Sequence, residues 1–366
     1  MITPRFLRNV FLKGLLLFAV FNIVWALFDP TGLGTLSSYN TLLRGRERLP
    51  FGENSAESYN LSLYDLDAMF ASHKLDGTPK AADEFRVIVV GDSSVWGTLL
   101  KPEETLAGLL DAAALQTADG KTVRVYNLGY PTLSLVKDLM ALDQSMRYHP
   151  DLILWPVTLE SFPRGRQLES PIVANNTRRV AELITRYNLN LVMPEVSTDF
   201  WQRTIIGQRR ALADLLRLQL YGVMWSATGI DQVYPADYEP AARDLKADES
   251  FHDWQPPAIP ADGLTLDVLA AGMKIAGEVP VVLINEPILI SAGANSNIRY
   301  NFYYPRWAYD QYRQALADAS AANSWRYLDL WDAVPQGHFT NSAIHLDVEG
   351  VGMLVQEIVA SGVITQ

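Results

Sequence analysis

The chain has 366 residues, of which 49% are hydrophobic and 19% charged, and this length allows one large or two modest domains, each with a core. Its net charge of −11 argues against a nucleic-acid partner, because phosphate binding requires a basic face. The lack of cysteine excludes disulfides, a thiol nucleophile and cysteine-ligated zinc, and the five histidines show no metal-binding spacing, so we expect no metal.

The first predicted element is an apolar helix. Residues 14–28 contain one polar residue, Asn22, and with residues 10–12 added the helix is about 28 Å long, close to the roughly 30 Å of a bilayer core. We therefore predict a membrane anchor over residues 1–28 that contacts lipid through residues 10–28. A cleaved signal peptide is less favoured because no small-residue cleavage site follows, and a buried helix is the third alternative.

Positive charges precede this helix, namely those of Arg5, Arg8 and Lys13. Cytoplasmic flanks of membrane helices are rich in such charges, so we expect a single-pass protein whose main domain is extracytoplasmic, in the periplasm or at the cell exterior. The sequence RGRERLP at residues 44–50 places further arginines beyond the other end and weakens this signal. Residues 29–84 are expected to form a juxtamembrane stalk that packs partly on the main domain.

From residue 85 onward, short apolar runs alternate with amphipathic stretches. Such runs are typical of strands that are buried on both faces of a parallel sheet. The predicted strands are 85–92, 123–129, 151–157, 279–285 and 326–331, and the predicted helices are 103–117, 133–148, 264–276, 305–322 and 347–360. The alternation predicts a three-layer, flavodoxin-like α/β domain over residues 85–366, with a parallel sheet of about five strands.

About 120 residues separate the third strand from the fourth, far more than a crossover needs. We predict a helical insertion at about 160–277 within this stretch. One helical pattern covers 176–188 and a second covers 198–230. The second is rich in Leu, Ile and Trp, and it either packs on its own domain or contacts a membrane surface or a protein partner.

Small or polar residues follow the predicted strands, at the sheet edge where ligands bind in open α/β folds. Ser93 follows the first strand within Gly-Asp-Ser-Ser, and His345 precedes the last helix. An imidazole that takes the serine proton, with backbone N–H groups aimed at a developing oxyanion, would make this serine a nucleophile. Gly91 and Gly129 suit the N–H role, because glycine lets a substrate approach the backbone closely. The alternatives are that Ser93 only caps a helix and that His345 is structural.

These residues resemble the SGNH, or GDSL-type, esterase and acyltransferase family. The Gly-Asp-Ser at 91–93, the Asn-Leu-Gly at 127–129 and the Phe-x-Asn-Ser-x-x-His-Leu at 339–346 occur in the family's order. The resemblance implies that Ser93 is the nucleophile and His345 the general base. It also implies that the N–H groups of Ser93 and Gly129 belong to the oxyanion hole, and that no cofactor is used.

Two blocks depart from the family's pattern. Glu160 stands where the third block has an asparagine of the oxyanion hole, and a carboxylate there would repel an oxyanion unless it were protonated or turned away. Ser342 stands three residues before His345, where the family has aspartate, and the nearest substitute, Asn341, carries no charge. A Ser-His dyad can still function, because the aspartate mainly orients and stabilises the imidazole. Carboxylates elsewhere could replace the aspartate, namely Asp329, Asp332 and Glu160.

Two functions from different classes are compatible with these features. The first is a membrane-anchored, extracytoplasmic serine esterase or O-acyltransferase that acts on an acylated cell-envelope glycan or lipid, because the layout resembles that of envelope acyl-modifying proteins. The second is a catalytically degenerate SGNH-like subunit of a membrane protein complex, which the missing asparagine and aspartate and the apolar insertion would suit. A phosphate or nucleotide site at the first turn is disfavoured, because the turn lacks G-x-G-x-x-G and a P-loop lysine.

Overall fold

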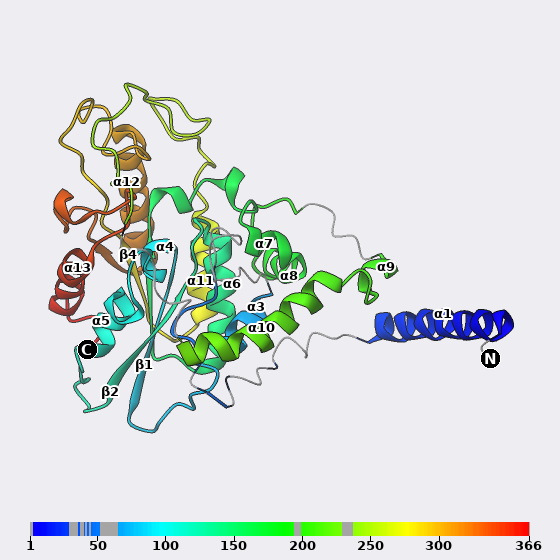
Figure 1. Cartoon of the computed structure of the whole chain (residues 1–366). Helices are drawn as coiled ribbons and strands as arrows, with labels where there is room; N and C mark the ends of the chain where they lie inside the picture. The colour runs from blue at the N-terminus through cyan, green and yellow to red at the C-terminus, as the bar shows by residue number, and fades with distance from the viewer. Residues whose placement is uncertain are drawn as a thin grey trace.

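The computed structural model describes residues 3–28, 36, 40, 42–43, 45–51, 65–193, 199–228 and 237–365. Its centre is a parallel sheet of five strands in the order β2-β1-β3-β4-β5 (Figure 1). The strands are β1 Glu84–Gly91, β2 Thr122–Gly129, β3 Leu152–Val157, β4 Val281–Asn285 and β5 Arg326–Asp329. The predicted parallel α/β fold is thus confirmed.

Helices cover both faces of the sheet. They are α3 Leu66–Ser72, α4 Ser93–Trp96, α5 Leu106–Ala112, α6 Leu135–Ser145, α11 Leu266–Ala276, α12 Arg306–Asn323 and α13 Val348–Ala360, with 3-10 turns at Pro102–Glu104, Met146–Tyr148, Leu159–Ser161, Arg164–Arg166 and Gln336–His338. Alternate residues of β1 point to opposite faces, because side chains alternate along a strand. Ile88 and Val90 pack with α3, α6, α11 and α12, whereas Val87 and Val89 pack with α5 and α13. The domain therefore has three layers.

Residues 45–51, which we call the strap, are part of this core although they lie outside the sheet. Arg48 is fully buried, and its guanidinium lies 4.1 Å from the ring centroid of Trp96. Its Nη1 donates to three carbonyls around the end of α4, at 2.9 to 3.1 Å, those of Trp96, Gly97 and Leu100. The indole N–H of Trp96 donates in turn to the carbonyl of Leu49 at 2.8 Å. The strap thus fixes the far end of the short helix that begins at Ser93.

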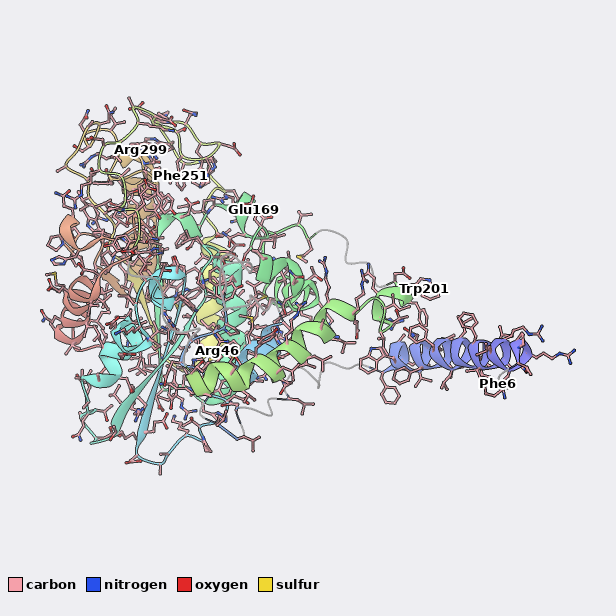
Figure 2. The ribbon with its side chains drawn as sticks, viewed as in Figure 1. Phe6, Arg46, Glu169, Trp201, Phe251 and Arg299 are labelled. Atoms are coloured by element: carbon pink, nitrogen blue, oxygen red, sulfur yellow. The ribbon has the colours of Figure 1, made fainter. Side chains whose placement is uncertain are left out.

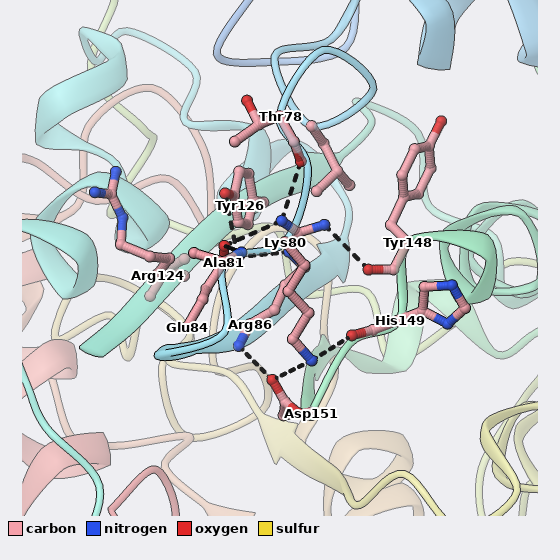
Figure 3. A network of polar contacts seen from close by, with 12 residues as sticks. Thr78, Lys80, Ala81, Glu84, Arg86, Arg124, Tyr126, Tyr148, His149 and Asp151 are labelled. Carbon is pink, nitrogen blue, oxygen red and sulfur yellow. Dashed lines mark hydrogen bonds and ion pairs between the residues drawn. The ribbon is translucent and has the colours of Figure 1, made fainter. Parts of the chain in front are cut away.

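The segment expected as a stalk, residues 29–84, is in part a piece of the α/β domain. Helix α3 is almost entirely buried. Its side chains belong to the core on the face of the sheet that α6, α11 and α12 cover. Residues 52–64 lie outside the described part of the chain. At the start of β1, Arg86 binds Glu84 and donates to the carbonyls of Thr78 and Tyr148, both at 3.1 Å (Figure 3). This polar network ties the incoming chain to the edge of the sheet where the strands begin.

The insertion between β3 and β4 is shorter than expected. Helix α11 packs against α6 on the sheet, so it is the crossover helix and not part of an insertion reaching residue 277. The described insertion helices are α7 Pro171–Asn175, α8 Thr177–Tyr187, α9 Phe200–Arg203 and α10 Arg209–Thr228. A single helix over 198–230 was wrong, because a turn at residues 204–208 separates α9 from α10.

The N-terminal helix α1, Pro4–Leu27, stands apart from the α/β layers (Figure 1). By length and composition it could cross a membrane, and most of its side chains are exposed. Its C-terminal end contacts α9, and α10 leads from there back to the domain, where it contacts α3.

Candidate active site

Ser93 is held at the end of β1 by its neighbours in the turn. Asp92 caps the helix that follows, since its Oδ1 accepts the N–H of Ser94 at 2.8 Å. The helix cap is therefore Asp92 and not Ser93, which was considered as a cap from the sequence. Gly129, at the end of β2, makes room for the helix, because a Cβ there would lie 2.5 Å from the backbone nitrogen of Trp96. The serine is therefore displayed at the edge of the sheet where the strands end.

The structure brings Ser93 and His345 together. His345 lies in the loop before α13, and its Nε2 is 2.7 Å from the Ser93 Oγ, although 252 positions separate the two residues. Its other ring nitrogen, Nδ1, is 2.7 Å from the Oδ1 of Asn341. Because an amide oxygen can only accept, Nδ1 carries the ring proton and Nε2 is left to accept the serine proton. This is the tautomer that a general base needs.

Of the two residues considered as third member, Asn341 reaches the imidazole. Ser342 is buried, and it is within hydrogen-bonding reach of the Tyr303 hydroxyl. The carboxylates considered as replacements lie elsewhere: Asp329 pairs with Arg313 and accepts from Asn285, and Asp332 is exposed. The His345 ring is thus oriented by an uncharged partner four residues before it.

Burial lowers the pKa of His345 from its ordinary 6.5 to about 4. The neutral imidazole is the form that can take a proton, so we expect kcat/KM to rise through about pH 4 and to be level above about pH 6. In Asn341→Asp a carboxylate would face Nδ1 and favour the imidazolium. The acid limb should therefore move up by about one to three pH units, because an opposite charge at this distance raises a histidine pKa.

The measurement is kcat/KM for a soluble ester between pH 3.5 and 8.5, with Asn323→Asp as the matched control, because Asn323 lies on α12 and bonds only the Ala319 carbonyl among the described contacts. An acid limb that stays in place in Asn341→Asp would contradict the contact of Asn341 with the His345 imidazole as a determinant of activity.

A cluster of buried ionisable groups lies close to Ser93 and Ser94. Glu286, which follows β4, is 2% exposed and accepts the hydroxyl of Ser94. Burial raises its pKa well above the ordinary value, and the neighbouring Asp92 raises it further. Lys137 of α6 donates to the carbonyl that ends β1 at 2.6 Å and pairs with Asp138. Burial and the neighbouring carboxylates thus favour the protonated form of Glu286, while the Lys137 ammonium faces Asp92 and Asp138.

Glu160 is 8% exposed and its charge is compensated. It forms an ion pair with Arg166, and its carboxylate is 2.9 Å from the Nε2 of His252. Both partners come from the insertion, whereas Glu160 itself follows β3. The repulsion of an oxyanion expected from this carboxylate is accordingly reduced.

A cavity of about 720 Å³ opens beside Glu160. Polar and aromatic side chains line it, among them those of Arg166, Glu169, Ser250, His252, Phe302 and Tyr303. Tyr303 connects this cavity with the loop that carries His345, because its hydroxyl also interacts with Ser342. The sequence singled out Glu160 but offered no signal for His252 or Tyr303, which lie far from it along the chain.

The two backbone N–H groups predicted to stabilise an oxyanion, those of Ser93 and Gly129, differ in their hydrogen bonding. The Gly129 N–H already donates to the Oδ1 of Asn127 at 3.0 Å, so it is engaged within the Asn-Leu-Gly block. The N–H of Ser93 lies at the start of α4, where the helix termini leave backbone donors. The oxyanion-hole role of Ser93 and Gly129 remains a prediction, and in the case of Gly129 it requires the amide to exchange partners.

The parallel strands in the order 2-1-3-4-5, with Ser93 after the first strand and His345 before the last helix, agree with the flavodoxin-like α/β fold that the resemblance to the SGNH family implies. No family model matches the chain, and no curated protein does. Among solved structures, the chain is similar to a lipolytic protein of the G-D-S-L family from Veillonella parvula, at 9% identity and a TM-score of 0.36, with 75% of this chain and 96% of that chain covered.

Two esterase structures are similar to the same extent. One is a catalytic mutant of an acetylxylan esterase from Geobacillus stearothermophilus, at 12% identity and a TM-score of 0.36, with 77% of this chain and 94% of that chain covered. The other is a carbohydrate acetylesterase family member from Sinorhizobium meliloti, at 13% identity and a TM-score of 0.32, with 75% and 97% covered. Similarities this low carry no argument about chemistry, which rests on the geometry of the site.

Proposed function

We propose that the protein is a membrane-anchored, extracytoplasmic serine esterase or O-acyltransferase that acts on an acylated cell-envelope glycan or lipid. The observation that carries the enzymatic part is the 2.7 Å separation of the Ser93 Oγ and the His345 Nε2, with the opposite ring nitrogen held by Asn341. A serine that only caps a helix does not need an imidazole in this tautomer.

The chemistry follows from this pair. The Ser93 Oγ attacks the ester carbonyl while His345 Nε2 takes its proton, and the negative charge that develops on the carbonyl oxygen is stabilised by N–H groups at the start of α4. His345 then protonates the departing alkoxide, which leaves an acyl group on Ser93. Water or an acceptor hydroxyl attacks this acyl-serine, with His345 again taking the proton, and the serine is regenerated. Water makes the protein an esterase, and an acceptor hydroxyl makes it a transferase.

The cavity beside Glu160 supports a hydroxyl-rich substrate. Its wall combines charged and hydroxyl side chains with aromatic rings, which together can bind the polar edges and the apolar face of a sugar. The location is supported by α1, which could cross a membrane, and by Arg5, Arg8 and Lys13 before its apolar run. An anchor would keep the site near substrates of the envelope.

The test is to trap the acyl-serine. The full chain in detergent is incubated with p-nitrophenyl acetate, quenched in acid within seconds and digested for mass spectrometry. We expect an acetyl group, a gain of about 42 Da, on the peptide that contains Ser93, because a serine nucleophile passes through a covalent acyl-enzyme. The same peptide from His345→Ala should carry none.

The alternative is a catalytically degenerate SGNH-like subunit of a membrane protein complex. It is favoured by the exposed apolar side chains of α10, such as Leu216 and Leu220, at 63% and 74% exposure. The trapping experiment separates the two functions. Release of p-nitrophenol no faster than from His345→Ala, with no acetylated Ser93 peptide, would contradict the enzyme and leave the scaffold.

A further inference from the structure

The turn from residue 199 to 210, which includes α9 and the first turn of α10, lies beside the end of α1. The Nε1 of Trp25, in the last turns of α1, donates to the Oε1 of Gln208 at 2.9 Å. Asn22 and Ala26, on the same side of α1, are 5% and 2% exposed, whereas most of the helix is exposed. The insertion therefore returns to the place where the apolar helix ends.

This turn is tightly built. The Thr204 hydroxyl donates to the Trp201 carbonyl at 2.6 Å and accepts the N–H of Gly207 at 3.2 Å. Gly207 is required for the close approach, because a Cβ there would lie 2.4 Å from the Trp201 carbonyl oxygen. Such a turn holds its outward side chains in fixed positions.

The outward side chains are apolar and basic. Trp201 is 68% exposed and Ile206 is 52% exposed, and Trp201 projects next to the end of α1 (Figure 2). The exposed cations around them are those of Arg203, Arg209 and Arg210. Tryptophan is enriched at the membrane–water interface, and arginine extends its charge from an apolar surface to the lipid headgroups.

We propose that this turn is a second membrane contact, with Trp201 and Ile206 inserted at the lipid–water boundary and the arginines bound to anionic headgroups. The proposal rests on the anchored part of the proposed function and is independent of the chemistry at Ser93. The occupant is a lipid surface because the turn lies beside the last residues of a helix that could cross the bilayer. Helix α10 leads from the turn back toward the α/β domain (Figure 1). We therefore expect residues further along α10 to lie outside the membrane contact.

The test uses single cysteines, which need no background removal because the chain has no cysteine. Ile206→Cys, Leu220→Cys and Asp318→Cys each receive an environment-sensitive fluorophore, and the full chains are reconstituted in vesicles of phosphatidylcholine and phosphatidylglycerol. Asp318 is the matched control, because it is exposed on α12. Quenching is measured with lipids that carry a nitroxide high on the acyl chain and, separately, with iodide in the buffer.

We expect the nitroxide lipids to quench the label at residue 206 at least about threefold more than the labels at 220 and 318, and iodide to show the reverse order. The difference should shrink in vesicles of phosphatidylcholine alone, because the arginines then lack anionic partners. Equal nitroxide quenching at 206 and 318 would overturn the proposal, and protection of 206 from both quenchers would show a protein partner in place of lipid.

Flotation of the same vesicles separates this proposal from the anchor. Chains that float with the lipid while residue 206 remains open to iodide would overturn the second contact and leave the anchor intact. Chains that do not float would contradict the anchor and, with it, the second contact.

Discussion

Ser93→Ala is expected to lower kcat/KM for p-nitrophenyl acetate by about 10³- to 10⁵-fold. The Ser93 oxygen is the atom that His345 approaches to 2.7 Å, and alanine leaves the imidazole without a nucleophile to activate. The loss should appear in kcat, because the change removes an interaction made in the transition state and leaves the cavity beside Glu160 intact.

A comparison of single and double variants tests whether Ser93 and His345 act together. His345→Ala should cost a similar factor, and the Ser93→Ala/His345→Ala double variant should lose no more than either single variant, since the two residues act as a unit. Ser361→Ala is the matched control, because Ser361 lies at the end of α13 and its hydroxyl bonds the Ile358 carbonyl. Losses that simply multiply in the double variant would contradict a Ser93–His345 unit.

Lys137→Met is expected to lower the free energy of unfolding by about 3–5 kcal/mol, as removal of one partner from a buried ion pair does. Lys137 is 1% exposed beside Asp138, at 2%, and it also faces Asp92. Methionine fills the same space without the charge, so both carboxylates would remain buried without their cation. Urea-induced unfolding of the full chain in detergent, followed by tryptophan fluorescence, gives the comparison.

The pH dependence of this loss provides a second readout. Burial already raises the pKa of Asp138, and without the ammonium it would rise further above the value in the unfolded chain. The folded variant would then bind more protons than the unfolded one, so its stability relative to the native protein should recover as the pH falls from 8 to about 5. Lys121→Met, at an exposed pair with Asp119, should cost less than about 1 kcal/mol at any pH. Equal losses for the two lysines would contradict the role given to Lys137.

The fold could be predicted from the sequence because its signals are local. The three central strands, β1, β3 and β4, are short apolar runs buried on both faces, and the serine turn follows directly from β1. The pairing of Ser93 with His345 was within reach for a related reason: parallel strands bring their carboxyl ends to one edge, so residues 252 positions apart along the chain could be expected to meet.

The surroundings of the site depend on contacts that leave no local pattern. Lys137 and Asp138 are neighbours on a helix that is buried nearly all round, and nothing in their sequence shows that both charges point inward. The partners of Glu160 are six and 92 positions away along the chain: Arg166 comes before the helices of the insertion and His252 comes after them. The arginines of the RGRERLP segment were used only to judge the orientation of the membrane helix. Arg48 is instead a fully buried hydrogen-bond donor.

The strap also determines where the folded unit begins. A shortened protein that started at β1 would keep all five strands and both candidate catalytic residues. It would lack Arg48 and Leu49, so three carbonyls at the end of α4 would lose their donor and the Trp96 indole would lose its acceptor. A cut that separates α1 from the folded unit and keeps the strap must therefore fall between residues 29 and 45. The link between α1 and the folded unit is thus shorter than the position of the sheet alone suggests.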